Sequence, residues 1–580
     1  MSIDGEIAVT GDRSKFLEIA VVVLSALVYA WTLSFQFVYD DIGQLVDNPS
    51  IRSWQFLPQY FNSHMWAGVL ANSNYYRPLV LLWFRLNYVL FGLSPAGWHF
   101  TSIMAHAAAT LLVLRLVYRL FANRTAAILS AMIFGLHPVH VQSVAWVSGV
   151  TDPVLAIFMT GSFLQYLIYR ESRKPIRLAW SLLLYVGATL TKEPGVILPA
   201  MIFAYEYTRP AENPAHSAAV RRVKAATLTV LPFVLVTFAY LAVRMRALHG
   251  FAPALFQMGT PTMIRTLPSI LWLNIEHLLL PWGYSLYYDF NPVQHFTDSQ
   301  FLLPVGSLFA LFVVLVGVCY LVRIPRNIVV VATIWFVLPL LPSLYLRAIP
   351  IAIFAQDRYL YISSIGFAIL ASNLILRVID VVAEQRELPL LLYTSATIGM
   401  ALASCTLIQQ QYWESNIALY RRAVSVAPNN EQALANLAVA LAEHKPIESL
   451  ALFEKSLRLD PNSAKLNYLF GYTLYRIGQY SPSLSPLARA AELDPSMAEA
   501  FLYIGMSHLK LGYPHDAEAE ITRSIVLEPH KRGAHLALGT VFEAEGNLSA
   551  AINETEIEAR TYPDDKLVQQ RLAELQHETR

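Results

Sequence analysis

The sequence predicts an all-α fold in two parts, a polytopic membrane helix bundle over residues 1–410 and a solenoid of helical repeats over residues 411–580. Of the 580 residues, 55% are hydrophobic and only 14% are charged, whereas soluble domains carry nearer a quarter of charged residues. The net charge of +1 conceals a division, because residues 1–411 hold 26 basic and 19 acidic residues and residues 412–580 hold 16 and 22. No basic stripe stands out, so no nucleic-acid partner is expected.

Apolar stretches long enough to cross a bilayer recur throughout the first part. Basic residues gather at every second gap between these stretches, 17 of the 26 falling on one side. The positive-inside rule therefore predicts a cytoplasmic N-terminus and places residues 409–580 outside. We expect about eleven spans, near residues 16–38, 98–119, 125–139, 153–170, 178–191, 194–208, 225–243, 301–322, 327–345, 359–376 and 388–408.

Two long loops, residues 39–97 and 245–300, are expected on the outer side. Both are rich in Trp, Tyr, Phe and Pro. This composition is typical of amphipathic segments at the membrane surface, which can build a pocket that faces the outer leaflet.

The second part carries a repeat with the tetratricopeptide (TPR) period. Its prolines, Pro428, Pro461, Pro495, Pro529 and Pro563, are spaced by 33, 34, 34 and 34 residues. One glycine of each repeat lets its two helices approach closely, and a second glycine seven residues later ends the first helix. We expect a half repeat at 413–428, four repeats over about 431–563 and a capping helix at 564–580.

Two adjacent carboxylates, Asp40 and Asp41, follow the first expected span directly. Such a pair above the bilayer can deprotonate a hydroxyl, with one carboxylate facing the pocket and the other bracing it. A helix N-cap or a solvated turn is the alternative. We expect Asp41 to be the base, narrowly ahead of Asp40.

Basic residues at the outer interface are the natural ligands of a phosphate group. The pair Lys192-Glu193 lies between two short spans, where ionisable groups are expensive and hence more often functional. Snorkelling of a side chain to the interface is an equal alternative for Arg244. The expected phosphate- or sugar-binding residues are Arg77, Lys192, Glu193, Arg244 and Arg358.

His137 and His140 are further candidates for binding phosphate or sugar hydroxyls. A two-histidine metal site is conceivable, but no third ligand stands at a useful spacing, and structural histidines beside Pro138 are a close alternative. The carboxylates Asp152, Asp289 and Asp357 have weaker claims. We expect no metal and no other cofactor.

Several blocks together resemble the TMTC family of protein O-mannosyltransferases, which combine membrane spans with tetratricopeptide repeats. The blocks are Tyr75-Tyr76-Arg77-Pro78-Leu79, Phe84-Arg85-Leu86-Asn87-Tyr88, Gly92-Leu93-Ser94-Pro95, Leu136-His137-Pro138-Val139-His140, Lys192-Glu193-Pro194-Gly195 and Asp357-Arg358-Tyr359-Leu360-Tyr361. They occur in the family's order, with Asp357 where the family usually has Glu.

The resemblance implies a GT-C-like glycosyltransferase whose catalytic acidic residue follows the first span, as Asp40-Asp41 does here. It further implies an inverting, metal-independent transfer of a sugar, mannose in the family, from a polyprenyl-phosphate donor. The repeats would lie on the same side as the active site and recruit a protein whose Ser or Thr accepts the sugar. A cell-envelope glycan or lipid is the alternative acceptor. A membrane-anchored scaffold without activity is the alternative function, and a transporter ranks lower because the ionisable residues lie at span ends.

Overall fold

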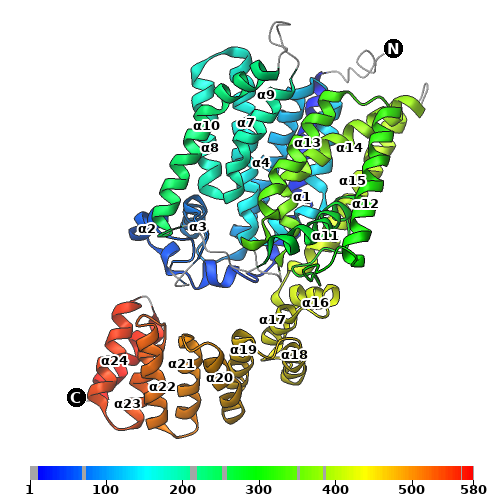
Figure 1. The fold of residues 1–580 in the computed structure, drawn as a ribbon. Helices are drawn as coiled ribbons and strands as arrows, with labels where there is room; N and C mark the ends of the chain where they lie inside the picture. The colour runs from blue at the N-terminus through cyan, green and yellow to red at the C-terminus, as the bar shows by residue number, and fades with distance from the viewer. Residues whose placement is uncertain are drawn as a thin grey trace. The chain divides into compact units, whose positions relative to one another are not determined.

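The computed structural model describes residues 11–67, 69, 73–209, 219–250, 258–348, 353–382, 387–563 and 565–578. All regular elements in these ranges are helical, which confirms the predicted fold class (Figure 1). The chain divides into two compact units, Met1–Leu419 and Tyr420–Arg580. The first unit extends past residue 410 because Gln36 N donates to Glu414 O at 3.1 Å and Tyr39 N donates to Asn416 Oδ1 at 2.8 Å.

The first unit is a bundle of long apolar helices. Among the described residues, eight helices are long and apolar enough to cross a membrane, or nine if a bent pair counts as one span. The chain is thus a multi-pass membrane protein. The bundle helices are α1 (Gly11–Leu27), α4 (Pro95–Phe121), α5 (Arg124–Leu136), α7 (Thr151–Ser172), α8 (Pro175–Thr191), α9 (Leu198–Thr208), α10 (Ala219–Ala247), α12 (Ser299–Leu321), α13 (Arg326–Leu340), α14 (Leu360–Val382) and α15 (Glu387–Gln410).

The expected count of eleven spans is not confirmed. The stretches expected at 178–191 and 194–208 form α8 and α9, which have only 17 and 11 residues. Extended backbone at Lys192 and a 3-10 turn over Glu193–Ile197 separate them. The bent pair is α5 and the segment Pro138–Ala145, which meet at 49° beside Pro138, whose ring cannot continue a helix.

The two long loops expected on the outer side contain helices of their own, α2 (Leu57–Asn62) and α3 (Pro78–Phe91) in the first and α11 (Thr260–Leu279) in the second. The first loop packs onto the bundle through a buried apolar cluster that includes Leu45, Tyr60, Phe84 and Trp98. This cluster therefore holds the loop between the first span and α4 against the bundle.

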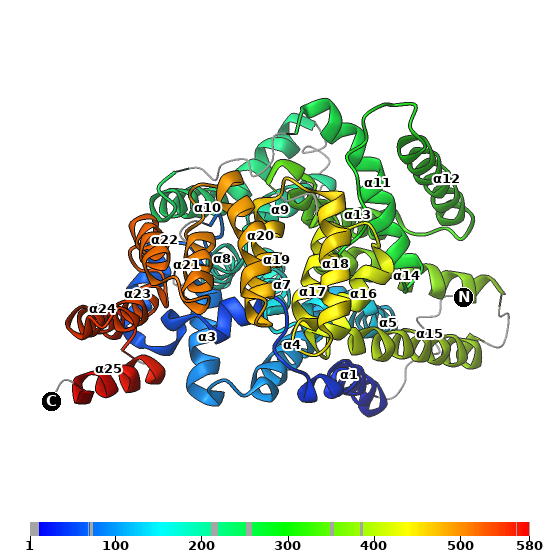
Figure 2. The same ribbon diagram turned by 90° about the horizontal axis from the view of Figure 1, so that it is seen from below.

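The second unit is a row of antiparallel helix pairs, seen from below in Figure 2. A Cβ on Gly471 would lie 2.6 Å from Leu487 Cγ, and Gly478, beyond the end of α19, has φ +81°. The two expected glycine roles are thus confirmed. The helix α16 (Asn416–Val426) begins in the first unit and continues into the second. The other helices of the second unit are α17 (Glu431–Leu441), α18 (Pro446–Leu459), α19 (Ala464–Arg476), α20 (Tyr480–Leu493), α21 (Ala498–Lys510), α22 (Pro514–Leu527), α23 (Ala534–Ala544), α24 (Leu548–Thr561) and α25 (Lys566–Glu578).

Candidate functional site

The two adjacent carboxylates occupy different environments. The chain turns sharply after the first span at Tyr39, whose φ is +55°. Asp41 is fully buried and accepts hydrogen bonds from Val38 N at 3.1 Å and from Ser148 N and Oγ at 2.8 and 2.6 Å. Burial raises the pKa of Asp41 to about 7, although these hydrogen bonds act in the opposite direction. Asp40 is only half-buried, so Asp41 anchors the turn while Asp40 keeps access to solvent.

An aromatic and cationic cluster adjoins this turn. The ring centroids of Tyr39 and Trp146 lie 5.6 Å apart, and the Trp413 ring stacks on the Trp146 ring at a centroid distance of 6.2 Å. The Arg358 guanidinium lies 4.9 Å from the Trp146 ring centre. Burial raises the pKa of Tyr39, the charge of Asp40 raises it further, and the charge of Arg358 lowers it, so Tyr39 lies within the fields of both.

Lys192 and Asp152 form a buried ion pair beside the cluster. Lys192 Nζ lies 2.5 Å from Asp152 Oδ1, and both side chains are less than a tenth exposed. Burial lowers the pKa of Lys192 to about 8; Asp152 opposes the shift, and the charges of Arg77 and Arg358 add to it. Three basic side chains therefore lie close enough to act on one another.

A second ion pair extends the site. Arg77 Nε lies 3.2 and 3.1 Å from the two carboxylate oxygens of Glu193, and its NH2 lies 2.6 Å from Oε2. Burial alone would raise the pKa of Glu193, but the charges of Arg77 and Arg244 hold it below its usual value. Arg244 also donates to Asn74 O at 2.9 Å and so links the first long loop to the end of α10.

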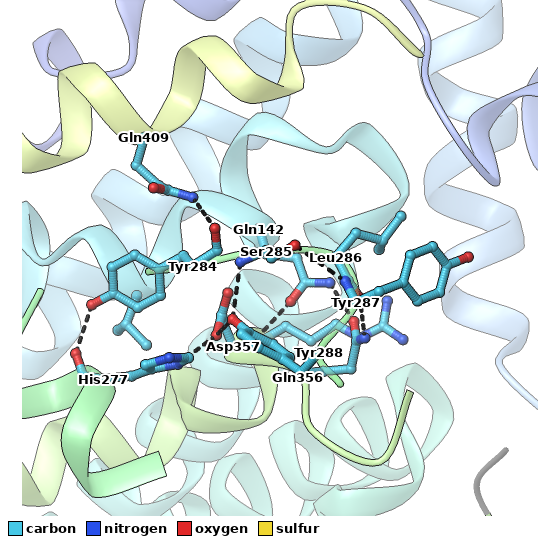
Figure 3. Close-up of polar contacts among 12 residues, drawn as sticks. Gln142, His277, Tyr284, Ser285, Leu286, Tyr287, Tyr288, Gln356, Asp357 and Gln409 are labelled. Carbon is cyan, nitrogen blue, oxygen red and sulfur yellow. Dashed lines mark hydrogen bonds and ion pairs between the residues drawn. The ribbon is translucent and has the colours of Figure 1, made fainter. Parts of the chain in front are cut away.

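Figure 3 shows a network of polar contacts around Asp357, which precedes Arg358 in the chain. Asp357 Oδ1 accepts from Tyr288 OH at 2.7 Å and pairs with His277 Nδ1 at 2.9 Å. The neighbouring Gln356 accepts a hydrogen bond from Gln142, whose own Oε1 accepts from Arg358 N at 3.1 Å. The buried side chains of His277 and Tyr288 therefore occupy the Asp357 carboxylate. The hydrogen bond from Arg358 N to Gln142 holds the backbone that carries Arg358.

Both candidate histidines are buried inside the bundle. His137 Nε2 contacts Leu278 O at 3.1 Å and its Nδ1 accepts from Val139 N at 3.2 Å. His140 is fully buried, with Nε2 2.8 Å from Ser364 Oγ. These partners favour the structural alternative over binding of phosphate or sugar by either histidine.

Asp289 follows Tyr288, a member of the Asp357 network. It lines a cavity of about 340 Å³ between α11 and α12, together with Glu276 and Trp272. Among the described side chains, the group of three spaced for a metal ion is His515, Glu518 and Glu545, in the second unit.

Several contributors carry no sequence signal of their own. Ser148 and Trp146 lie in a short apolar stretch, and Gln142 resembles any polar residue at a helix turn. His277 and Tyr288 come from the second long loop, far along the chain from Asp357. Only the fold shows which of these side chains meet.

Fold and site together define a multi-pass membrane protein in which basic and acidic side chains converge at one end of a helix bundle, followed by a tetratricopeptide-repeat unit. Eight of the expected site residues meet there: Asp40, Asp41, Arg77, Asp152, Lys192, Glu193, Arg244 and Arg358.

Comparison with curated proteins confirms the resemblance to the TMTC family. The chain is 25% identical over 502 residues to the mouse protein O-mannosyl-transferase TMTC3, covering 79% of this chain and 53% of the relative. It is 24% identical over 455 residues to the Caenorhabditis elegans protein O-mannosyl-transferase F38B6.6, covering 76% and 62%. A segment of 204 residues is 31% identical to mouse protein O-mannosyl-transferase TMTC1, covering 33% and 22%. The chain spans about half the length of the first of these relatives.

No family model matches the chain. Among solved structures, the crystal structure of MamA is 22% identical and covers 25% of this chain and 80% of that one, with a TM-score of 0.23. The crystal structure of YrrB, described as a TPR protein with an unusual peptide-binding site, is 21% identical. The match covers 30% of this chain and 88% of that one, with a TM-score of 0.24.

Proposed function

We propose that the protein is an integral-membrane glycosyltransferase that moves a sugar, mannose by analogy with its relatives, from a polyprenyl-phosphate donor to a hydroxyl of an acceptor protein. The observation that carries this proposal is the convergence of the Asp40-Asp41 turn with Arg358, Lys192 and Arg77. The curated relatives that cover most of the chain are named protein O-mannosyl-transferases.

The half-buried Asp40 suits the general base better than Asp41, which reverses the order expected from the sequence. Its carboxylate takes the proton of the acceptor hydroxyl as the hydroxyl oxygen attacks the anomeric carbon. The bond between that carbon and the phosphate oxygen breaks, and the polyprenyl phosphate leaves with the electron pair. A direct displacement of this kind inverts the anomeric centre without a covalent enzyme intermediate. Asp41 positions the base through its hydrogen bonds to Ser148.

The basic residues suit stabilisation of the departing phosphate. Four of them, Arg77, Lys192, Arg244 and Arg358, outnumber the two carboxylates that form ion pairs with them, Asp152 and Glu193. The carboxyl groups of Asp40 and Asp41 complete the charges of the site. Among the described residues, no carboxylate forms an ion pair with Arg358 or Arg244, but Arg244 donates to Asn74 O. Arg358 lies beside Tyr39, next to Asp40, so its guanidinium is well placed to meet the phosphate. A monophosphate leaving group of this charge needs no metal ion in addition.

The orientation of the chain follows from the same proposal. The site would face the outer side of the membrane, the periplasm, cell exterior or ER lumen, with a cytoplasmic N-terminus. The tetratricopeptide repeats would lie on that side and hold an acceptor polypeptide so that its Ser or Thr reaches Asp40.

Transfer of radiolabelled mannose from polyprenyl-phosphate mannose to a Ser/Thr-rich acceptor tests the proposal. Arg358→Met should lose at least about tenfold, because a charge-assisted contact to phosphate is worth about 1.5–3 kcal/mol. Arg323→Met, at an exposed position after α12, is the matched control. Unchanged transfer by Arg358→Met, or no transfer by the wild type with any polyprenyl-phosphate sugar, would favour the scaffold alternative.

A further inference from the structure

A second cavity lies at the other end of the first span. It measures about 380 Å³ and is formed by α1, α4 and the start of α5. The span that carries α1, Ser14–Ser34, has 21 residues, so a helical rise of 1.5 Å per residue puts roughly 30 Å between its ends. The cavity is lined by Lys15, Glu18, Ile19, Val22, Val23, Leu111, Arg115 and Arg124.

The polar part of the cavity is organised around one buried carboxylate. Glu18, with a side chain only 8% exposed, pairs with Arg115 NH1 at 3.2 Å and with Arg124 Nε at 2.9 Å. The two guanidinium groups remain 50% and 40% exposed, and Arg124 NH1 also donates to Ser14 Oγ at 2.7 Å. With the exposed Lys15, three cations face one carboxylate, an excess of two positive charges.

The apolar part of the cavity continues from the charges toward the middle of the bundle. Ile19, Val22 and Val23 follow Glu18 at the spacing of one helix face, and Leu111 lies one turn before Arg115 on α4. Ile19, Val23 and Leu111 are 63%, 46% and 38% exposed. Both helices therefore place their charges near the membrane surface and an open apolar stripe within the bilayer.

We infer that this cavity binds an anionic phospholipid, with the phosphate between Lys15, Arg115 and Arg124 and an acyl chain along Ile19, Val22 and Val23. Basic pockets between membrane helices attract anionic headgroups, and the unbalanced positive charge disfavours a zwitterionic lipid. The buried Glu18 holds both guanidinium groups in place before the lipid arrives. Because this cavity and Asp40 lie at opposite ends of one span, the bound lipid is distinct from a sugar donor.

Native mass spectrometry of the full chain in neutral detergent tests the inference, with phosphatidylglycerol and phosphatidylcholine as probes. We expect preferential retention of phosphatidylglycerol and about fivefold weaker binding for each cation removed, as in Arg115→Gln or Lys15→Gln. Arg119→Gln is the matched control, because Arg119 lies one turn further on α4 and pairs with Glu171 outside the cavity. It should bind the lipid like the wild type.

Two further measurements test whether binding needs both the headgroup and the acyl chains. Glycerophosphoglycerol, which has the headgroup without acyl chains, should not bind, and Val23→Trp should weaken binding of phosphatidylglycerol by filling the apolar stripe. Equal retention of both lipids, equal loss in Arg119→Gln and Arg115→Gln, or binding of the headgroup alone would overturn the inference. All of these readouts are independent of glycosyl transfer.

Discussion

The buried carboxyl of Asp41 should make the stability of the membrane unit depend on pH. In the folded chain burial raises its pKa to about 7, whereas the ordinary value is 3.8. Between these values the folded state holds a proton that the unfolded state has lost, so the contribution of Asp41 to stability is greatest below pH 4 and falls as the pH rises to 7. The difference corresponds to about 4 kcal/mol. Asp41→Asn, which cannot ionise, removes this dependence.

Thermal unfolding in detergent at pH 4 to 8 measures the effect. The measured quantity is the difference in unfolding midpoint between wild type and Asp41→Asn at each pH. For a unit of this size, about 4 kcal/mol corresponds to roughly 4 °C, so this difference should change by that amount as the pH rises from 4 to 8. Asp47→Asn, at an exposed carboxylate on the same loop, is the control. A midpoint difference that stays constant from pH 4 to 8, or an equal pH-dependent change with Asp47→Asn, would show that the buried Asp41 carboxyl is not the source of the pH dependence.

Three further substitutions test the packing and the charges. Lys192→Met leaves Asp152 buried without its partner and should destabilise the membrane unit by about 3–5 kcal/mol. Stability should recover when Asp152→Leu is added, and a Lys192→Met variant that unfolds like the wild type would contradict the prediction. Gly505→Val places a side chain where even a Cβ would lie 2.6 Å from Ile521 Cγ1. The repeat unit should therefore lose about 1–3 kcal/mol of stability, measured by thermal unfolding of the full chain. An unchanged unfolding midpoint would argue against close contact between the two helices. Arg77→Lys cannot contact both oxygens of its carboxylate partner and should lower mannose transfer about tenfold; transfer at the wild-type rate would remove Arg77 from the site.

The sequence predicts the fold well where a period or a long apolar run governs it. The 34-residue proline spacing leads directly to the helix pairs of the repeat unit, because each repeat contacts mainly its neighbours. The span count is harder, since α8 and α9 are separated where the sequence predicts but have only 17 and 11 residues. The reach of the first unit to Leu419 depends on Glu414 and Asn416, whose contacts have no local signal.

For the site, the sequence identifies residue types and the structure decides their partners. The pair Asp40-Asp41 is visible in the sequence, but the hydrogen bonds from Ser148 that distinguish the two carboxylates come from a residue 107 positions away. His137 and His140 have the residue type that binds phosphate, yet burial in the bundle gives them protein partners. Residue type alone does not report burial.

The most direct test of the account compares transfer of labelled mannose from polyprenyl-phosphate mannose by the purified wild type, Asp40→Asn and Asp41→Asn, with EDTA present and folding checked for each variant. Loss of a general base lowers a rate by about 10²–10⁴-fold, so Asp40→Asn should be nearly inactive while folded. Asp41→Asn should retain part of the wild-type activity, and the wild type should be unaffected by EDTA. A folded Asp40→Asn that transfers mannose at the wild-type rate, or activity that EDTA abolishes, would contradict the proposed chemistry.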